Sequence, residues 1–341
     1  MSLRKRLRNL AHNLKDKASV FAAALSIKRH VSSARVHVLR ATTHSLSTPP
    51  SEARVAAVLS AGQGSHLLPR ACINALMDRL HRTQSATVAL KCLFMLHNVM
   101  AKGPFTLKDH LSHYPSNGGH NFLNLSTFRD HSDLETLELS SWVRWYAGVL
   151  EHVITVSRVL GYYLSSSLRD SIKRVCLGVS SGDLLYKIQG LVVFVEHVSH
   201  VPESLHLQKN DLVYELVRLV GEDYGSVQRE ILLRVEEIGE RVGNLDVGEL
   251  RELVGYLERL EETKERLQLL FVNRKKNNGF WDLIDRTKAK AVAVVEEREG
   301  KWLTVVRRGT TQSGSTRFTN PFLDPGQLIP VPPSGGWPGV N

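Results

Sequence analysis

The chain has 341 residues, of which 42% are hydrophobic and 23% are charged, and its formal net charge is +10. This composition excludes a disordered or collagen-like chain and is sufficient for the core of one large domain or two ordinary ones. The three cysteines, Cys72, Cys92 and Cys176, form no CxxC pair, which indicates buried core residues in a reducing compartment rather than a disulfide framework or a zinc site.

The positive charge is concentrated in the first sixth of the chain. Residues 1–60 contain eleven lysines and arginines but only two acids, Asp16 and Glu52. Charge localised in this way indicates a surface for an anionic partner. Nucleic acid is one such partner, but no recognition-helix or base-stacking motif accompanies the cations, so we expect no nucleic-acid binding.

Residues 1–17 form a basic amphipathic segment. Leu3, Leu7, Leu10 and Leu14 recur at spacings of four, three and four, which places them on one side of a helix. Such a helix can insert Leu3, Leu7 and Leu10 into a bilayer interface, or it can pack the same stripe on the domain. No apolar run approaches the roughly 18 residues needed to span a bilayer, so any membrane contact is expected to be peripheral.

Helical periodicity continues along most of the chain. Pro49 and Pro50 predict a helix start at Ser51, and Gly62 and Gly64 predict its end near Ser60. Further helices are predicted at residues 67–80, 85–100, 140–163, 168–177, 183–199, 209–242, 246–274 and 280–299. No stretch alternates apolar and polar residues over a strand length, so the predicted fold is an all-α solenoid of stacked helix pairs.

Catalytic and metal motifs are not recognisable in the sequence. It contains no GxxxxGK[ST] loop, no GxGxxG after a strand, and no HExxH or GxSxG. His197 and His200 share one predicted helix, but no third ligand follows at a defined spacing. Trp142, Trp145 and Tyr146 share a helix face, which favours core packing over base stacking. We expect no enzyme activity, metal or cofactor.

Five segments occur in a characteristic order along the chain. They are KDKASVFAAAL (15–25), RATTH (40–44), TVALKCLFMLHNVMAKG (87–103), LNLSTFRD (123–130) and LSSWVRWYAGVLEHV (139–153). Together they resemble the ANTH domain of the clathrin assembly proteins, a domain related to the ENTH domain. The five segments are most similar to those of the plant clathrin assembly proteins. The resemblance implies a superhelical solenoid with an extended C-terminal helical section, and a non-enzymatic clathrin adaptor.

Four regions are expected on this basis. They are the basic segment 1–17, an ENTH/ANTH-like membrane-binding helical domain at 18–165, the C-terminal helical part of the ANTH domain at 166–299, and a flexible tail at 300–341. The tail prediction also rests on composition, since Gly, Pro, Ser and Thr dominate there.

The resemblance also implies a phosphoinositide site around ATTH, as for phosphatidylinositol 4,5-bisphosphate. Arg40 takes the place of the family's lysine before ATTH, and Arg54 falls in the cation cluster that follows; His44, Lys28 and Arg29 are assigned to the same site. Glu52 lies at one of the cluster's positions. Two interpretations therefore stay open: charge-driven phosphoinositide binding, and a helical interaction scaffold with a degraded lipid site.

The tail contains Asn320-Pro321-Phe322, which resembles the NPF ligand of EH-domain endocytic proteins. Proline sets a turn that presents Phe322 to a hydrophobic pocket. The family resemblance further implies clathrin and vesicle SNAREs as partners in clathrin-mediated endocytosis. The expected location is cytoplasmic and peripheral to membranes, at clathrin-coated pits, clathrin-coated vesicles and the Golgi.

Overall fold

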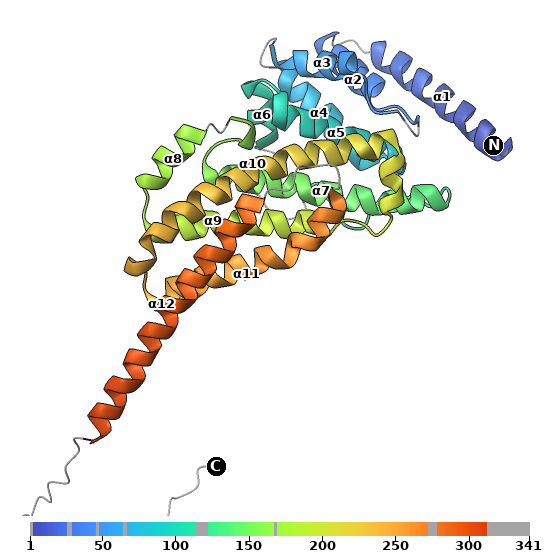
Figure 1. The fold of residues 1–341 in the computed structure, drawn as a ribbon. Helices are drawn as coiled ribbons and strands as arrows, with labels where there is room; N and C mark the ends of the chain where they lie inside the picture. Colours follow the sequence, from blue (N-terminus) through green and yellow to red (C-terminus); the bar gives the residue numbers. More distant parts are fainter. Residues whose placement is uncertain are drawn as a thin grey trace, which may run out of the picture. The chain divides into compact units, whose positions relative to one another are not determined.

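The computed structural model describes residues 3–25, 29–45, 48–63, 67–112, 122–166, 169–271 and 278–311. Within these ranges the chain forms twelve α-helices and four short 3-10 helices, without strands (Figure 1). The α-helices are α1 (Leu3–Ala24), α2 (Arg29–Ala41), α3 (Glu52–Leu59), α4 (Leu67–Arg82), α5 (Ala86–Lys102), α6 (Phe105–Ser112), α7 (Leu134–Leu160), α8 (Arg169–Leu177), α9 (Ser181–Ser199), α10 (Asp211–Arg241), α11 (Val247–Leu270) and α12 (Asn278–Thr311). The all-α prediction is confirmed.

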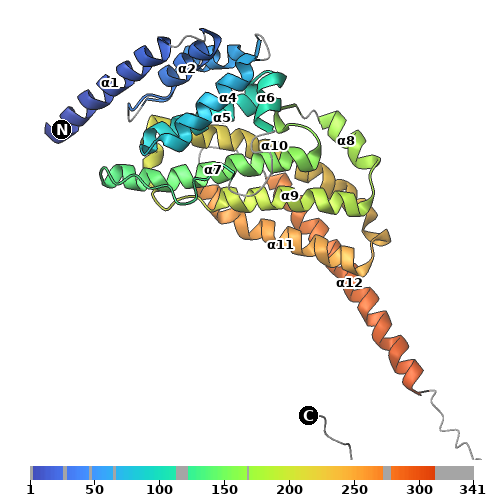
Figure 2. The same cartoon turned by 180° about the vertical axis from the view of Figure 1, so that it is seen from behind.

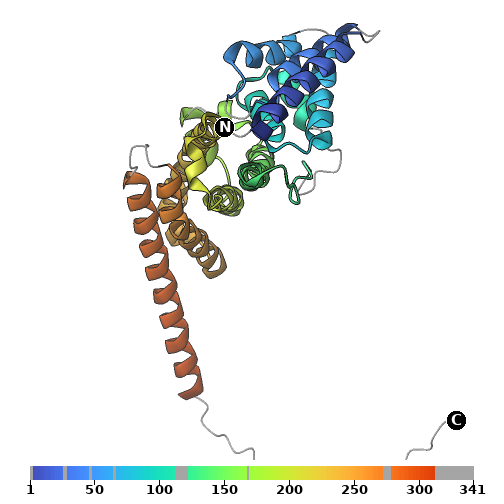
Figure 3. The same cartoon turned by 90° about the vertical axis from the view of Figure 1, so that its right-hand side faces the viewer.

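Two compact units divide the chain, one ending at Val295 and the other beginning at Glu296. In the first unit, helices α2, α4, α5, α7, α9 and α11 each contact the next in this series. Figure 2 shows α7, α9 and α11 side by side, and Figure 3 shows the blue and cyan helices α1 to α6 stacked on the green and yellow ones. The long helix α10 packs along α8 and α9. This arrangement is a superhelical stack of helices, as the predicted solenoid requires.

Helix α5 lies at the centre of the N-terminal half. Every residue from Ala86 to Met100 is buried, because α3, α4, α6 and α7 all contact this helix. Its nearly uniform apolar sequence is what such surroundings require. On α7, Trp142, Trp145 and Tyr146 are also buried, which confirms that these aromatic residues belong to the core.

Helix α10 is held by polar side chains that reach across the core. The ring of His97 on α5 lies 2.7 Å from the hydroxyl of Tyr146 and 2.9 Å from the carboxylate of Asp223. Further along α10, the buried Glu230 and Arg234 form an ion pair, and Tyr162 donates a hydrogen bond of 2.8 Å to Glu230. Removing Glu230 or Arg234 alone would leave a buried charge without its partner, which is strongly destabilising.

Some helix boundaries differ from those predicted. Helix α7 begins at Leu134 rather than Ser140, because Asp133 accepts a hydrogen bond of 2.8 Å from the backbone of Thr136, whose hydroxyl accepts one of 3.0 Å from the backbone of Asp133. This is a capping box in which threonine replaces the usual glutamate. Helix α6 was not predicted.

Two of the predicted domain boundaries fall inside helices. Helix α1 continues through residues 17 and 18 to Ala24, since no glycine or proline interrupts it. Helix α12 continues past Gly300 to Thr311. A single glycine costs a helix only about 1 kcal/mol, and the residues that follow, KWLTVVRR, contain no helix breaker. The helical part therefore extends beyond the predicted tail boundary.

Candidate functional site

The stretch 40–54 connects α2 to α3. Arg40 lies in the last turn of α2 and Arg54 in the first turn of α3, and both side chains are exposed. Helices α2 and α3 contact each other. Ser51 precedes α3 in an extended conformation and makes no capping hydrogen bond through its side chain. Glu52, also exposed, introduces a negative charge beside Arg54.

His44, by contrast, is buried. Its backbone N–H donates to Asp16 over 2.9 Å, and its ring Nδ1 lies 2.7 Å from the other oxygen of the same carboxylate. Arg79 on α4 donates to Asp16 over 3.4 Å and to the carbonyl of Thr42 over 2.9 Å. Burial alone would raise the pKa of Asp16, but the hydrogen bonds from His44 and the charge of Arg79 hold it below its ordinary value. Asp16 therefore joins α1 to the ATTH loop.

Lys91 holds this loop from the opposite side. Its side chain is 1% exposed, and its ammonium donates to the carbonyl of Ser45 over 2.8 Å and to the hydroxyl of Thr43 over 3.3 Å. Burial and, to a smaller extent, the nearby charge of Arg54 lower the pKa of Lys91 to about 8 against the opposing effect of Asp16. The sequence marked Lys91 only as part of TVALK. Its place beneath the loop depends on how α5 packs.

Helix α1 is oriented with its polar side toward the protein. Arg8 pairs with Asp133 over 2.6 Å, and the ring of His12 lies 4.7 Å from that of His44. The opposite side carries the leucine stripe, with Leu7 58%, Leu10 59% and Leu14 68% exposed. The described part of the stripe thus does not pack on the domain.

The remaining predicted site residues lie partly or wholly outside the described structure. Lys28 falls outside the described residues, as do Asn320, Pro321 and Phe322. Leu3 and Arg29 belong to α1 and α2, but the description does not include their side chains. The structure therefore places Arg40, His44, Arg54, Leu7 and Leu10, and it separates the exposed arginines from the buried histidine.

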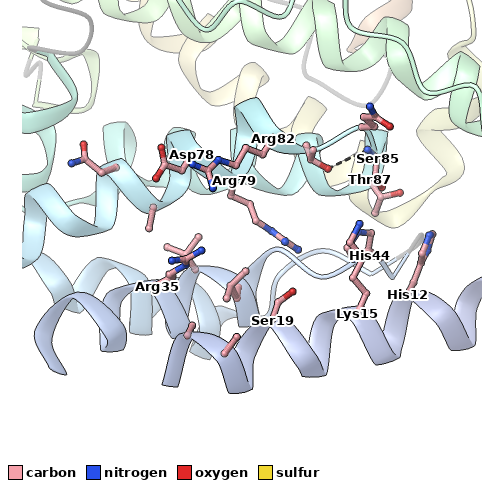
Figure 4. Close-up of a pocket in the computed structure, with 18 of the residues that line it drawn as sticks. His12, Lys15, Ser19, Arg35, His44, Asp78, Arg79, Arg82, Ser85 and Thr87 are labelled. Carbon is pink, nitrogen blue, oxygen red and sulfur yellow. Dashed lines mark hydrogen bonds between the residues drawn. The ribbon is translucent and has the colours of Figure 1, made fainter. Parts of the chain in front are cut away.

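A groove lies between α1, α2 and α4 (Figure 4). In Figure 4, Lys15 and His12 of α1 lie beside His44, and Arg79 of α4 points into the space between the helices. Searched over the described residues, the structure has no cluster of three or more His, Cys, Asp or Glu side chains suited to a metal ion. None of the helices in those residues has the length and apolarity of a membrane span.

The fold is an all-α superhelical stack, and its N-terminal part exposes both cations and the leucine stripe of α1. These features define a class of helical interaction domain. The ANTH domain model matches residues 33–276. Two Arabidopsis thaliana proteins, "Putative clathrin assembly protein At4g40080" and "Putative clathrin assembly protein At5g10410", are 38% and 33% identical to the chain. These matches cover 92% and 81% of this chain and 90% and 83% of the two relatives. The chain belongs to the ANTH domain family.

Proposed function

We propose that this ANTH protein is a non-enzymatic clathrin adaptor that binds membranes peripherally through its N-terminal face. The observation that carries the proposal is the orientation of α1. A soluble helix normally turns its apolar side to the core, whereas Leu7, Leu10 and Leu14 of α1 face solvent and Asp16 and Arg8 face the protein. An apolar stripe presented in this way suits the interfacial region of a bilayer.

The head-group site in this proposal lies at the α2–α3 connection. Arg40 and Arg54 contact phosphates, the backbone N–H groups at the start of α3 add donors, and Lys28 and Arg29 add charge. His44 keeps the loop in place through Asp16. Each well-placed cation contributes about 1 kcal/mol of attraction to an anionic leaflet. Two exposed arginines beside Glu52 support a charge-driven attachment, with phosphatidylinositol 4,5-bisphosphate as the first ligand to test.

Attachment would place the helical stack and the tail at the site of coat assembly. The printed names of the relatives describe clathrin assembly proteins, which supports clathrin as a partner of this chain. In this proposal, vesicle SNAREs bind to the helical stack, and EH-domain proteins bind to the NPF tripeptide. The proposed locations are clathrin-coated pits and vesicles and the Golgi.

Liposome cosedimentation tests the membrane part of the proposal. The wild-type chain should sediment with liposomes containing phosphatidylinositol 4,5-bisphosphate, and less as salt rises, because surface charge is screened over about 10 Å at 0.1 M. Replacing Arg40 and Arg54 by glutamate should release it. Duplex DNA at matched salt serves as the competing polyanion, and tighter binding to DNA would contradict the proposal.

The second candidate is a helical scaffold without lipid binding, favoured by the carboxylate of Glu52 beside Arg54. It predicts that clathrin capture persists while liposome binding is weak and is unchanged in the Arg40→Glu/Arg54→Glu variant.

A further inference from the structure

The groove between α1, α2 and α4 is large, and of the residues assigned to the proposed head-group site it includes His44 but not the exposed arginines. Its volume is about 1010 Å³, and neither Arg40 nor Arg54 lines it. Ligand pockets usually measure roughly 300–1,000 Å³, so this groove is at the upper end of that range. Along α1 its lining extends from Arg8 to Ala23, a length of roughly 22 Å at the rise of an α-helix. The groove is thus long enough for an extended ligand.

Cations line both sides of the groove. They are Arg8, Lys15, Arg35, Arg70, Arg79 and Arg82. Arg8 pairs with Asp133 and Arg79 with Asp16, whereas the other four form no ion pair with another described residue. Two acids also line the groove. Asp130, which accepts a hydrogen bond of 2.8 Å from the backbone of Ala86 at the start of α5, and Asp78 therefore oppose the four cations that form no ion pair, and the balance stays positive. The groove therefore attracts an anion.

One carboxylate of the chain itself is already bound beside the groove. The carboxylate of Asp16 is held by the backbone and ring of His44, at 2.9 and 2.7 Å, and by Arg79 at 3.4 Å. His44 and Arg79 also line the groove. A carboxylate is thus already bound at the wall of the groove by a histidine and an arginine.

The spacing of the cations favours an elongated ligand over a compact one. Arg70 and Arg82 lie at opposite ends of α4, roughly 18 Å apart along the helix axis. A single head group cannot contact both, whereas six residues of extended chain span roughly 20 Å. At the Arg70 end, Val31 and Leu67 line the groove and are 43% and 71% exposed. This end of the groove is suited to an apolar side chain.

We propose that the groove between α1, α2 and α4 binds an extended acidic segment of a partner protein. Carboxylates of the segment pair with Lys15, Arg35, Arg70 and Arg82, and an apolar residue at one end contacts Val31 and Leu67. Because these cations are exposed, binding weakens with salt. The proposal is independent of the membrane role of Arg40 and Arg54.

The test uses fluorescence anisotropy with a labelled decapeptide of eight glutamates followed by two leucines. The Arg70→Glu/Arg82→Glu variant of the full chain should bind it at least tenfold more weakly than wild type. A matched control, Arg266→Glu/Arg286→Glu, makes the same change of net charge at exposed positions outside the groove and should change affinity less than twofold. All four side chains are exposed, so melting curves should stay unchanged and show that both variants fold.

Two further measurements make the result specific. Leu67→Ser should weaken binding of the leucine-ended peptide but not of a decapeptide of glutamate alone. Arg40→Glu/Arg54→Glu should leave peptide affinity within twofold of wild type, so this inference and the membrane proposal can fail separately. Three results would each overturn the proposal. The first is an equal loss of affinity in the groove and control variants, and the second is no binding of either peptide by wild type. The third is a groove variant that loses liposome binding but keeps peptide binding.

Discussion

Three side chains hold the loop after α2 in place. Asp16 reaches it from α1, Arg79 from α4 and Lys91 from α5. None of these contacts is local in sequence, and each provides a hydrogen-bond partner for a polar group of the loop. The exposed Arg40 and Arg54 lie on either side of this fixed segment, so the conformation of the proposed head-group site depends on buried residues.

Replacing Asp16 by asparagine should lower the free energy of unfolding by about 1–2 kcal/mol at pH 7, because an amide accepts fewer and weaker hydrogen bonds than an ionised carboxylate. The folded pKa of Asp16 lies below its ordinary value of 3.8. This contribution is therefore present above about pH 3.8 and disappears as pH falls through the lower folded value. Urea unfolding at pH 7 and pH 3 measures the difference.

The exposed Asp78→Asn is the matched control, and it should change stability little at either pH. Hydrogen exchange should show faster exchange of the α1 amides in Asp16→Asn only. Unchanged α1 exchange would contradict the role of Asp16 as the link between α1 and the loop.

Lys91→Met should alter how stability depends on pH. The pKa of Lys91 is about 8 in the folded chain against an ordinary 10.5, so between these values the unfolded state binds more protons. Stability of the wild type therefore rises with pH in this window, by about 3 kcal/mol from this group. Urea unfolding from pH 7 to 10 should show wild type gaining stability relative to Lys91→Met. The exposed Lys102→Met on the same helix should show no such change, and parallel curves for wild type and Lys91→Met would refute the assignment.

At the scale of elements, α1 is an amphipathic helix whose orientation is opposite to that of an ordinary surface helix, because its polar side faces the protein and its apolar side faces solvent. Its polar residues lie against α2, α4 and the ATTH loop, while its leucines face outward. The other helices of the stack bury their apolar residues between neighbours, as the continuous core from α2 to α12 shows. Helix α1 is therefore the helix that we propose to contact the membrane.

Replacing Leu7 and Leu10 by serine should weaken liposome binding by about tenfold or more, since burying one leucine contributes roughly 1.5 kcal/mol or more. The melting temperature should stay the same, because both side chains are more than half exposed in the folded chain. Cosedimentation and thermal melting measure the two effects. Leu269→Ser, at a position 60% exposed on α11, should affect neither, and a fall in melting temperature with liposome binding intact would contradict membrane insertion.

At the scale of the whole molecule, the chain combines a helical stack with a C-terminal segment of different composition. Residues 312–341 lie outside the described structure, and their sequence is rich in Gly, Pro, Ser and Thr. A short peptide ligand in such a segment binds weakly by itself and gains strength when its partner shares the same membrane, through effective concentration. The proposed adaptor therefore depends on both parts.

Phe322→Ala should abolish capture of EH-domain proteins, because the phenylalanine of an NPF turn occupies the partner's pocket. Helix content, melting temperature and liposome binding should not change, since the composition of the segment predicts no contribution to the core. Pull-down with purified EH domains measures the loss. A peptide of residues 316–325 that caused no chemical-shift change in any EH domain would mean that the tripeptide is a chance occurrence.

The sequence by itself determined the fold class, the family and most of the helices, because these follow from local periodicity and from motifs in a characteristic order. It also located the cationic N-terminal region and the aromatic core residues of α7. The start of α7 was missed because its capping box uses Thr136 instead of glutamate. The extension of α12 was missed because Gly300 was read as the end of a helix.

Only the tertiary structure decided which side of each helix faces a neighbour. The leucine pattern in residues 3–14 identified a stripe but left membrane insertion and core packing equally open, and the contacts of Asp16 and Arg8 show that the opposite side faces the protein. Likewise, the pattern around ATTH could not distinguish the buried His44 from the exposed Arg40, or place Lys91 beneath the loop. The periodicity of a sequence gives the direction in which a side chain points from the axis of its own helix. Burial depends on whether another helix, distant in sequence, packs on that side.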